Sequence, residues 1–77
     1  IKMPETKVMF HDAEEVEEFV NAASRCDFDI DIFYNRIVID AKSILGILSM
    51  GLCRALTVQC YGDSPEFNQT LQKFAVA

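Results

Sequence analysis

The sequence predicts a two-layer α+β domain, in which four antiparallel strands are covered on one face by three helices in the order β-α-β-β-α-β-α. Apolar residues first recur with helical spacing, at positions 16, 19, 20 and 23, and then with the period of two typical of strands, at positions 28, 30 and 32. A capping residue stands before each expected helix. No linker, repeat or low-complexity tract divides the 77 residues, so we expect one domain over residues 1–77.

The first strand and the first helix follow each other closely. A short apolar run predicts a strand at Lys7–Phe10. A helix is expected next, because Asp12 can cap a free backbone N–H and Glu15, three residues later, completes an acidic capping box. We expect this helix to end between Ser24 and Asp27. Its core-facing stripe consists of Val16, Phe19, Val20 and Ala23.

A β-hairpin is expected after the first helix. Apolar residues alternate with aspartates from Phe28 to Ile32, which indicates a strand with one solvated face. Tyr34 and Asn35 form the expected tight turn, because asparagine tolerates a positive φ. The returning strand is expected at Arg36–Asp40.

A short second helix is expected from Ile44 to about Gly51. Ser43 can cap its start, and Gly51 offers a left-handed end. Apolar side chains surround this helix almost completely, which is more than one buried stripe can use. The apolar residues of this helix are Ile44, Leu45, Ile47, Leu48, Met50 and Leu52. We therefore expect some of these six side chains to remain at the surface, where they could contact a partner.

The last strand and the last helix complete the pattern. Apolar and polar residues alternate over Leu56–Tyr61, and Gly62 turns the chain. Ser64 can then cap a helix that has Pro65 at its first position and Glu66 in its first turn. Its inner face is expected to be Phe67, Leu71 and Phe74.

The composition excludes several classes of partner. Lys and Arg total 7 against 12 Asp and Glu, for a net charge of −5, and no basic cluster is present, so nucleic acid is not an expected partner. No apolar run is long enough to span a bilayer, and we expect no membrane insertion. Cys26, Cys53 and Cys60 are odd in number and lack CxxC spacing. We interpret them as buried or half-buried thiols in a reducing compartment and, with no secretory signal at the start, expect a cytoplasmic protein.

Residue patterns for cofactor chemistry are also missing. The sequence has no Ser-His-Asp order with supporting glycines, no phosphate-binding glycine-rich loop and no His/Cys cluster. Asp27, Asp29 and Asp31 resemble the start of a calcium loop, but the required glycine and terminal glutamate are missing. We therefore expect no cofactor, no metal and no small-molecule ligand.

One segment carries a resemblance to a known family. Residues 40–52, DAKSILGILSMGL, resemble the K-S-I-[ML]-G-[IVL]-[ML]-S-L-[GA] stretch around the regulatory serine of bacterial histidine-containing phosphocarrier (HPr) proteins. Similar spacings continue at Ala23-Ser24-Arg25 and at Tyr34-Asn35. The resemblance implies an open-faced α/β sandwich and protein partners from the phosphotransferase system for sugar transport or from carbon regulation.

The family's active site differs at this chain's corresponding positions. In the family, the histidine of a G-[IL]-H-A-R-P sequence accepts phosphate from a phosphoenolpyruvate-dependent enzyme and passes it to sugar transporters. Counting back from Ser43 without gaps places Asp12 at the histidine, Glu14 at the arginine and Glu15 at the proline. His11 lies one position too early.

This replacement reverses the charge of the site. A phosphohistidine is an anion that the N–H groups and dipole of a helix start stabilise, together with the adjacent arginine. Asp12, Glu14 and Glu15 would oppose it, each close pair by about 1 kcal/mol even in water. We therefore predict an HPr-like regulatory or interaction module without normal phosphocarrier activity. The alternative is a divergent phosphocarrier that accepts phosphate on His11; otherwise His11 is a partly exposed loop residue before an acidic cap.

Ser43 and the second helix supply two further candidate sites. The resemblance implies that Ser43 is a target of regulatory phosphorylation, as in a catabolite-repression paralogue that lacks the active histidine and keeps the serine. An N-cap serine is worth about 1 kcal/mol, which alone accounts for its presence. The resemblance also implies that Ile44, Leu45 and Leu48 dock partner enzymes, although their spacing is equally compatible with core packing.

Overall fold

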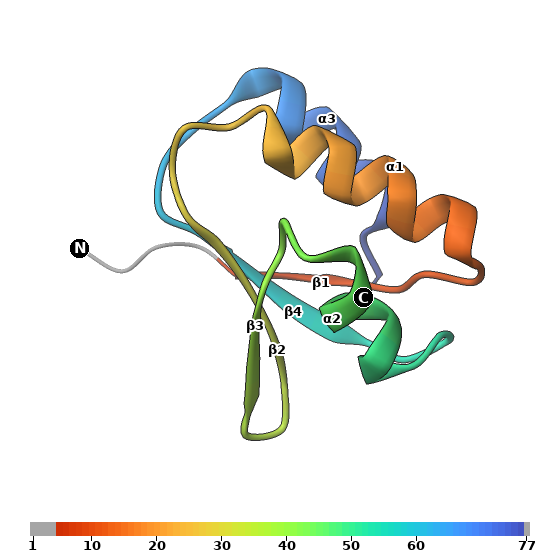
Figure 1. Cartoon of the computed structure of the whole chain (residues 1–77). Coiled ribbons are helices and arrows are strands. Elements are labelled where there is room, and N and C mark those ends of the chain that lie inside the picture. Colours follow the sequence, from red (N-terminus) through yellow and green to blue (C-terminus); the bar gives the residue numbers. More distant parts are fainter. Residues whose placement is uncertain (1–4, 77) are drawn as a thin grey trace.

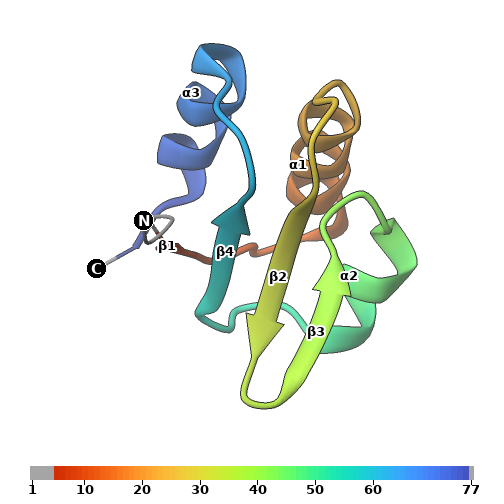
Figure 2. The same ribbon diagram turned by 90° about the vertical axis from the view of Figure 1, so that its left-hand side faces the viewer.

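Four antiparallel strands form a single sheet in the computed structural model, and three helices cover one of its faces (Figures 1 and 2). The structure describes residues 5–76. The element order confirms the expected β-α-β-β-α-β-α arrangement. In chain order the elements are β1 (Glu5–Val8), α1 (Ala13–Ser24), β2 (Ile30–Tyr34), β3 (Ile37–Asp40), α2 (Ile44–Met50), β4 (Leu56–Cys60) and α3 (Pro65–Phe74).

The strand order in the sheet is β1-β4-β2-β3. In the two central strands, Ile32 lies opposite Val58. Both are buried, and their neighbours along each strand are partly exposed. This period of two gives the sheet one apolar face under the helices and one open face. No helix in residues 5–76 is long and apolar enough to cross a membrane.

Aromatic side chains form the part of the core that fixes the start of α1. The Phe10 ring centroid lies 5.1 Å from that of Phe19 in α1 and 5.2 Å from that of Phe74 in α3. Phe67 continues the cluster, 5.5 Å from Phe19. Aromatic pairs at these separations add to the burial energy. Phe10 thus anchors the loop between β1 and α1 to both long helices.

The three predicted N-caps are confirmed. The side chains of Asp12, Ser43 and Ser64 accept hydrogen bonds from the backbone N–H three residues later, at 2.9, 3.2 and 3.2 Å. Gly51 ends α2 with a φ of 95° and a ψ of 154°, a positive-φ conformation that favours glycine but differs from the left-handed helical stop that was expected. Local sequence signals therefore placed the helix ends well.

Strand boundaries needed correction. The first strand covers Glu5–Val8 instead of Lys7–Phe10, because Met9 N–H donates to the Phe74 carbonyl at 3.1 Å and Phe10 turns into the core. The second strand begins at Ile30 instead of Phe28. In both cases the ladder partner, which a single segment does not reveal, set the boundary.

The hairpin turn and one cysteine also differ from the prediction. Tyr34 pairs with Ile37, so the turn residues are Asn35 and Arg36, with Asn35 at a φ of 54°, and Arg36 lies outside the strand. Cys26 and Cys60 are half-buried as expected, but Cys53 is exposed. Cys53 has a φ of 61° and lies in the loop after α2, where residues 52–55 are all exposed to solvent.

Candidate functional site

The candidate site is the loop between β1 and α1 together with the first turn of α1. Phe10 is buried, whereas the side chain of the next residue, His11, is 64% exposed. The buried Phe10 therefore holds the loop in place, and the side chain of His11 extends into solvent. The sequence from residue 9 to residue 24 contains no Lys or Arg, so no cation in this segment accompanies the helix start.

Asp12 is the N-cap of α1. Its backbone is extended, with φ −152° and ψ 173°, and its Oδ1 accepts from the Glu15 N–H at 2.9 Å. The free N–H groups and the dipole make a helix start a natural place for an anion. Here the chain's own carboxylate occupies that place.

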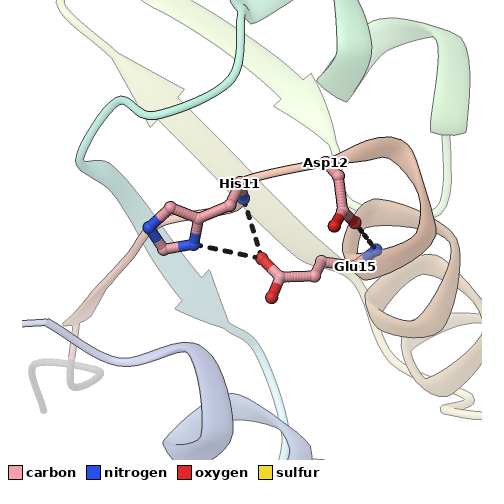
Figure 3. Close-up of polar contacts among 3 residues, drawn as sticks. All are labelled: His11, Asp12 and Glu15. Carbon is pink, nitrogen blue, oxygen red and sulfur yellow. Dashed lines mark hydrogen bonds and ion pairs between the residues drawn. The ribbon is translucent and has the colours of Figure 1, made fainter.

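Glu15 ties His11 to the same turn. Its Oε1 accepts from the His11 backbone N–H at 2.7 Å and lies 3.3 Å from His11 Nδ1. Figure 3 shows the Glu15 carboxylate reaching toward His11 while the Asp12 carboxylate caps the helix on the other side. The expected capping box is thus present in altered form, since Glu15 bonds to the residue before the N-cap instead of the N-cap itself.

A second segment supports this loop, and sequence reasoning missed it. Cys53 N–H donates to the Phe10 carbonyl at 2.7 Å, which places the loop after α2 directly beside the loop that carries His11. The only local signal was Gly51, which marks the end of α2 but not where the following residues go. A backbone hydrogen bond therefore connects the loop that carries His11 with the loop that follows α2.

Ser43 lies at the start of α2. It is half-buried, and its Oγ accepts from the Gly46 N–H at 3.2 Å. The first turn of α2 contains no acidic residue. A negative group on this oxygen would meet the helix N–H groups without a neighbouring carboxylate in that turn.

The three predicted docking residues differ in exposure. Leu45 is 78% exposed, whereas Ile44 and Leu48 are half-buried and pack against the core. Ile47 and Met50 provide the buried face of α2. The expected surplus of apolar residues on this helix is therefore present, and Leu45 is its most exposed member. No group of His, Cys, Asp or Glu in residues 5–76 is arranged to hold a metal ion.

Comparison with known proteins gives a consistent result. A family model described as "PTS HPr component phosphorylation site" matches residues 11–76. Two crystal structures have the same fold. The phosphocarrier protein HPr from Bacillus anthracis is 23% identical, with 96% of this chain and 99% of that chain covered and a TM-score of 0.76. HPr-C-His from Thermoanaerobacter tengcongensis is 25% identical, with 92% and 89% covered and a TM-score of 0.73.

Proposed function

The chain belongs to the HPr family of the phosphotransferase system, and on that premise we propose that it is a regulatory or protein-interaction member without normal phosphocarrier activity on a histidine. One observation carries the proposal: the Asp12 carboxylate caps α1 at the place where an anion would otherwise be stabilised. Counted from Ser43, this is also the position of the family's phosphorylated histidine.

Electrostatics opposes a phosphoryl group here. Asp12, Glu14 and Glu15 bring three carboxylates to the helix start, and the family's arginine is replaced by one of them. Each additional like-charge pair at about 4 Å costs about 1 kcal/mol in water and more where solvent is excluded. The N–H of Glu15 is already bonded to Asp12 and is not free for a phosphate oxygen.

The alternative is phosphate transfer to His11. The exposure of its imidazole favours this reading, because the ring is accessible to a partner enzyme. Glu15 opposes it, since its Oε1 lies 3.3 Å from Nδ1 and would repel a phosphoryl group on that nitrogen. Only Nε2 would then be available.

The second part of the proposal concerns partner binding. Leu45 is 78% exposed beside the half-buried Ile44 and Leu48, so a partner that covered this helix would remove a large apolar side chain from water. We assign docking to Leu45, supported by Ile44 and Leu48, with partners from the phosphotransferase system or carbon regulation. Phosphorylation of Ser43, immediately before these residues, would add charge at the edge of this face and so modulate docking.

Intact mass after incubation with phosphoenolpyruvate and a general phosphotransferase enzyme tests the first part. The proposal predicts no gain of phosphate under conditions that fully phosphorylate an ordinary HPr. A gain of one acid-labile phosphate that is lost in His11→Ala would contradict it and establish the alternative. Incubation with an HPr serine kinase, with Ser43→Ala as control, tests modification of Ser43 separately.

A titration with the same phosphotransferase enzyme tests docking. Leu45→Ala is expected to weaken binding by about tenfold, the size of effect expected for a central apolar anchor. Glu66→Ala, an exposed residue of α3, is the matched control and should leave binding unchanged. Equal affinity of the unaltered chain and Leu45→Ala would exclude this face as the docking surface.

A further inference from the structure

The two edges of the sheet are protected differently. At β1, the C-terminal residues cover the edge: Val76 N–H donates to the Lys7 carbonyl at 2.8 Å, and Val8 forms a bridge with Ala75. β3 lies at the opposite end of the strand order, and within residues 5–76 no strand pairs with its outer side. An unpaired edge of this kind is a template for another strand.

The backbone groups available at β3 follow from the register. Ala41, the residue after the strand, donates its N–H to the Ile30 carbonyl at 2.8 Å, so its amide points toward β2. Backbone groups alternate in direction along an antiparallel strand. The N–H groups of Val38 and Asp40 therefore point away from the sheet, where a further strand would lie.

Two of the side chains at this edge are apolar and exposed, and the charged residues lie only at its ends, Arg36 before the strand and Asp40 at its last position. Ile37 is 52% exposed and Val38 is 55% exposed. Residues 36–40 contain neither lysine nor proline, the residues that most often block an edge. Figure 2 shows β3 as the outermost arrow of the sheet, with α2 beside it on the helical face.

We propose that β3 pairs antiparallel with β3 of a second copy of this chain, with Val38 on the two-fold axis. The segment Arg36-Ile37-Val38-Ile39-Asp40 is self-complementary in this register. Val38 lies opposite the second copy's Val38, isoleucine lies opposite isoleucine, and Arg36 lies opposite Asp40 at both ends. The outward N–H groups of Val38 form reciprocal hydrogen bonds in the same register.

Charge complementarity favours a second copy of this chain as the partner of β3. Asp40 lies directly opposite Asp31 of β2, a like-charge pair that destabilises a sheet. Among residues 5–76 the ion pairs are His11–Glu15 and Lys73–Glu18, so neither aspartate has a cationic partner in this described part of the chain. The second copy's Arg36 would stand beside Asp40, on the same face of the sheet, and offset this repulsion.

The apolar rows of the sheet continue across the proposed contact. Phe33 lies opposite Val38 on the open face, and the second copy extends this row by another valine and phenylalanine. Because the two-fold axis is perpendicular to the sheet, the helices of both copies lie on the same face. The result is one continuous sheet in which neither copy exposes this edge.

Sedimentation equilibrium of the 77-residue chain tests the pairing. A monomer–dimer equilibrium is expected, and Arg36→Asp or Asp40→Arg should each weaken it by about tenfold by placing like charges opposite each other. The double variant R36D/D40R restores opposite charges and should recover most of the affinity. A monomer at all concentrations up to the millimolar range would overturn the proposal. So would a dimer that the single variants leave unchanged, or one that the double variant fails to restore.

Val38→Pro provides an independent test of the strand edge. Proline removes only the outward N–H of Val38 and leaves the groups that face β2 in place, so the fold should be retained by circular dichroism. The dimer is expected to be lost in this variant. A folded Val38→Pro chain that still dimerises would show that association uses another surface.

Discussion

The starts of α1 and α2 have the same capping hydrogen bond but different charge. Each helix begins with a side-chain oxygen that accepts from the backbone N–H three residues later. At α1 this oxygen belongs to a carboxylate, and Glu14 and Glu15 follow in the first turn. At α2 it belongs to the neutral Ser43, with no acidic residue in the first turn. Under the proposed function, the position aligned with the family's histidine already holds a negative charge, whereas Ser43 is the position where a phosphate would add one.

The largest expected effect concerns the anchor beneath the α1 start. Phe10→Ala removes a fully buried ring that contacts Phe19 and Phe74, and should lower the free energy of unfolding by about 3–5 kcal/mol. Urea denaturation measures this directly. A loss below about 1 kcal/mol would mean that the loop carrying His11 is not held by the core, because truncation of a well-packed phenylalanine costs more than that.

Removal of either helix cap should lower the free energy of unfolding by less than Phe10→Ala does, and by different amounts at α1 and α2. Asp12→Ala is expected to cost about 1–2 kcal/mol and Ser43→Ala about 0.5–1 kcal/mol, because a charged cap also interacts with the helix dipole. Asp12→Asn keeps the hydrogen-bond acceptor and removes the charge, so it separates the two contributions. Added salt should reduce the difference in the free energy of unfolding between the unaltered chain and Asp12→Asn, because it screens the interaction of the charge with the helix dipole. Equal losses for Asp12→Ala and Ser43→Ala in low salt would contradict the electrostatic contrast.

The smallest expected effect on stability is at Leu45. Because its side chain is mostly exposed, Leu45→Ala should change the free energy of unfolding by less than about 0.5 kcal/mol. Ile47→Ala, two residues further along α2 and buried, should cost about 2–5 kcal/mol and serves as the matched comparison. A large loss for Leu45→Ala would mean that this leucine is a core residue instead of a docking residue.

Local signals predicted much of the fold. Asp12, Ser43 and Ser64 each precede a helix whose apolar residues have the right spacing, and all three caps are confirmed. The alternation of Ile30 and Ile32 with aspartates likewise identified β2. These signals depend on residues within a few positions of one another, which is why a single sequence reveals them.

Contacts between distant segments were not predictable in this way. The end of β1 is set by the bond from Met9 to Phe74, and the loop after α2 reaches the site through the bond from Cys53 to Phe10. The sequence predicted that carboxylates gather at the start of α1. It did not predict that the Glu15 carboxylate accepts a hydrogen bond from the backbone N–H of His11 instead of that of Asp12. That choice depends on the path of the loop, which the burial of Phe10 fixes.

The most direct test compares three chains in one phosphotransfer reaction. The unaltered chain, Asp12→His, and the triple variant Asp12→His/Glu14→Arg/Glu15→Pro are incubated with phosphoenolpyruvate and the general phosphotransferase enzyme, and phosphate is followed by intact mass over time. We predict no phosphate on the unaltered chain, slow transfer to Asp12→His and much faster transfer to the triple variant. Phosphate on the unaltered chain at the rate of the triple variant would contradict the claim that these carboxylates close the site.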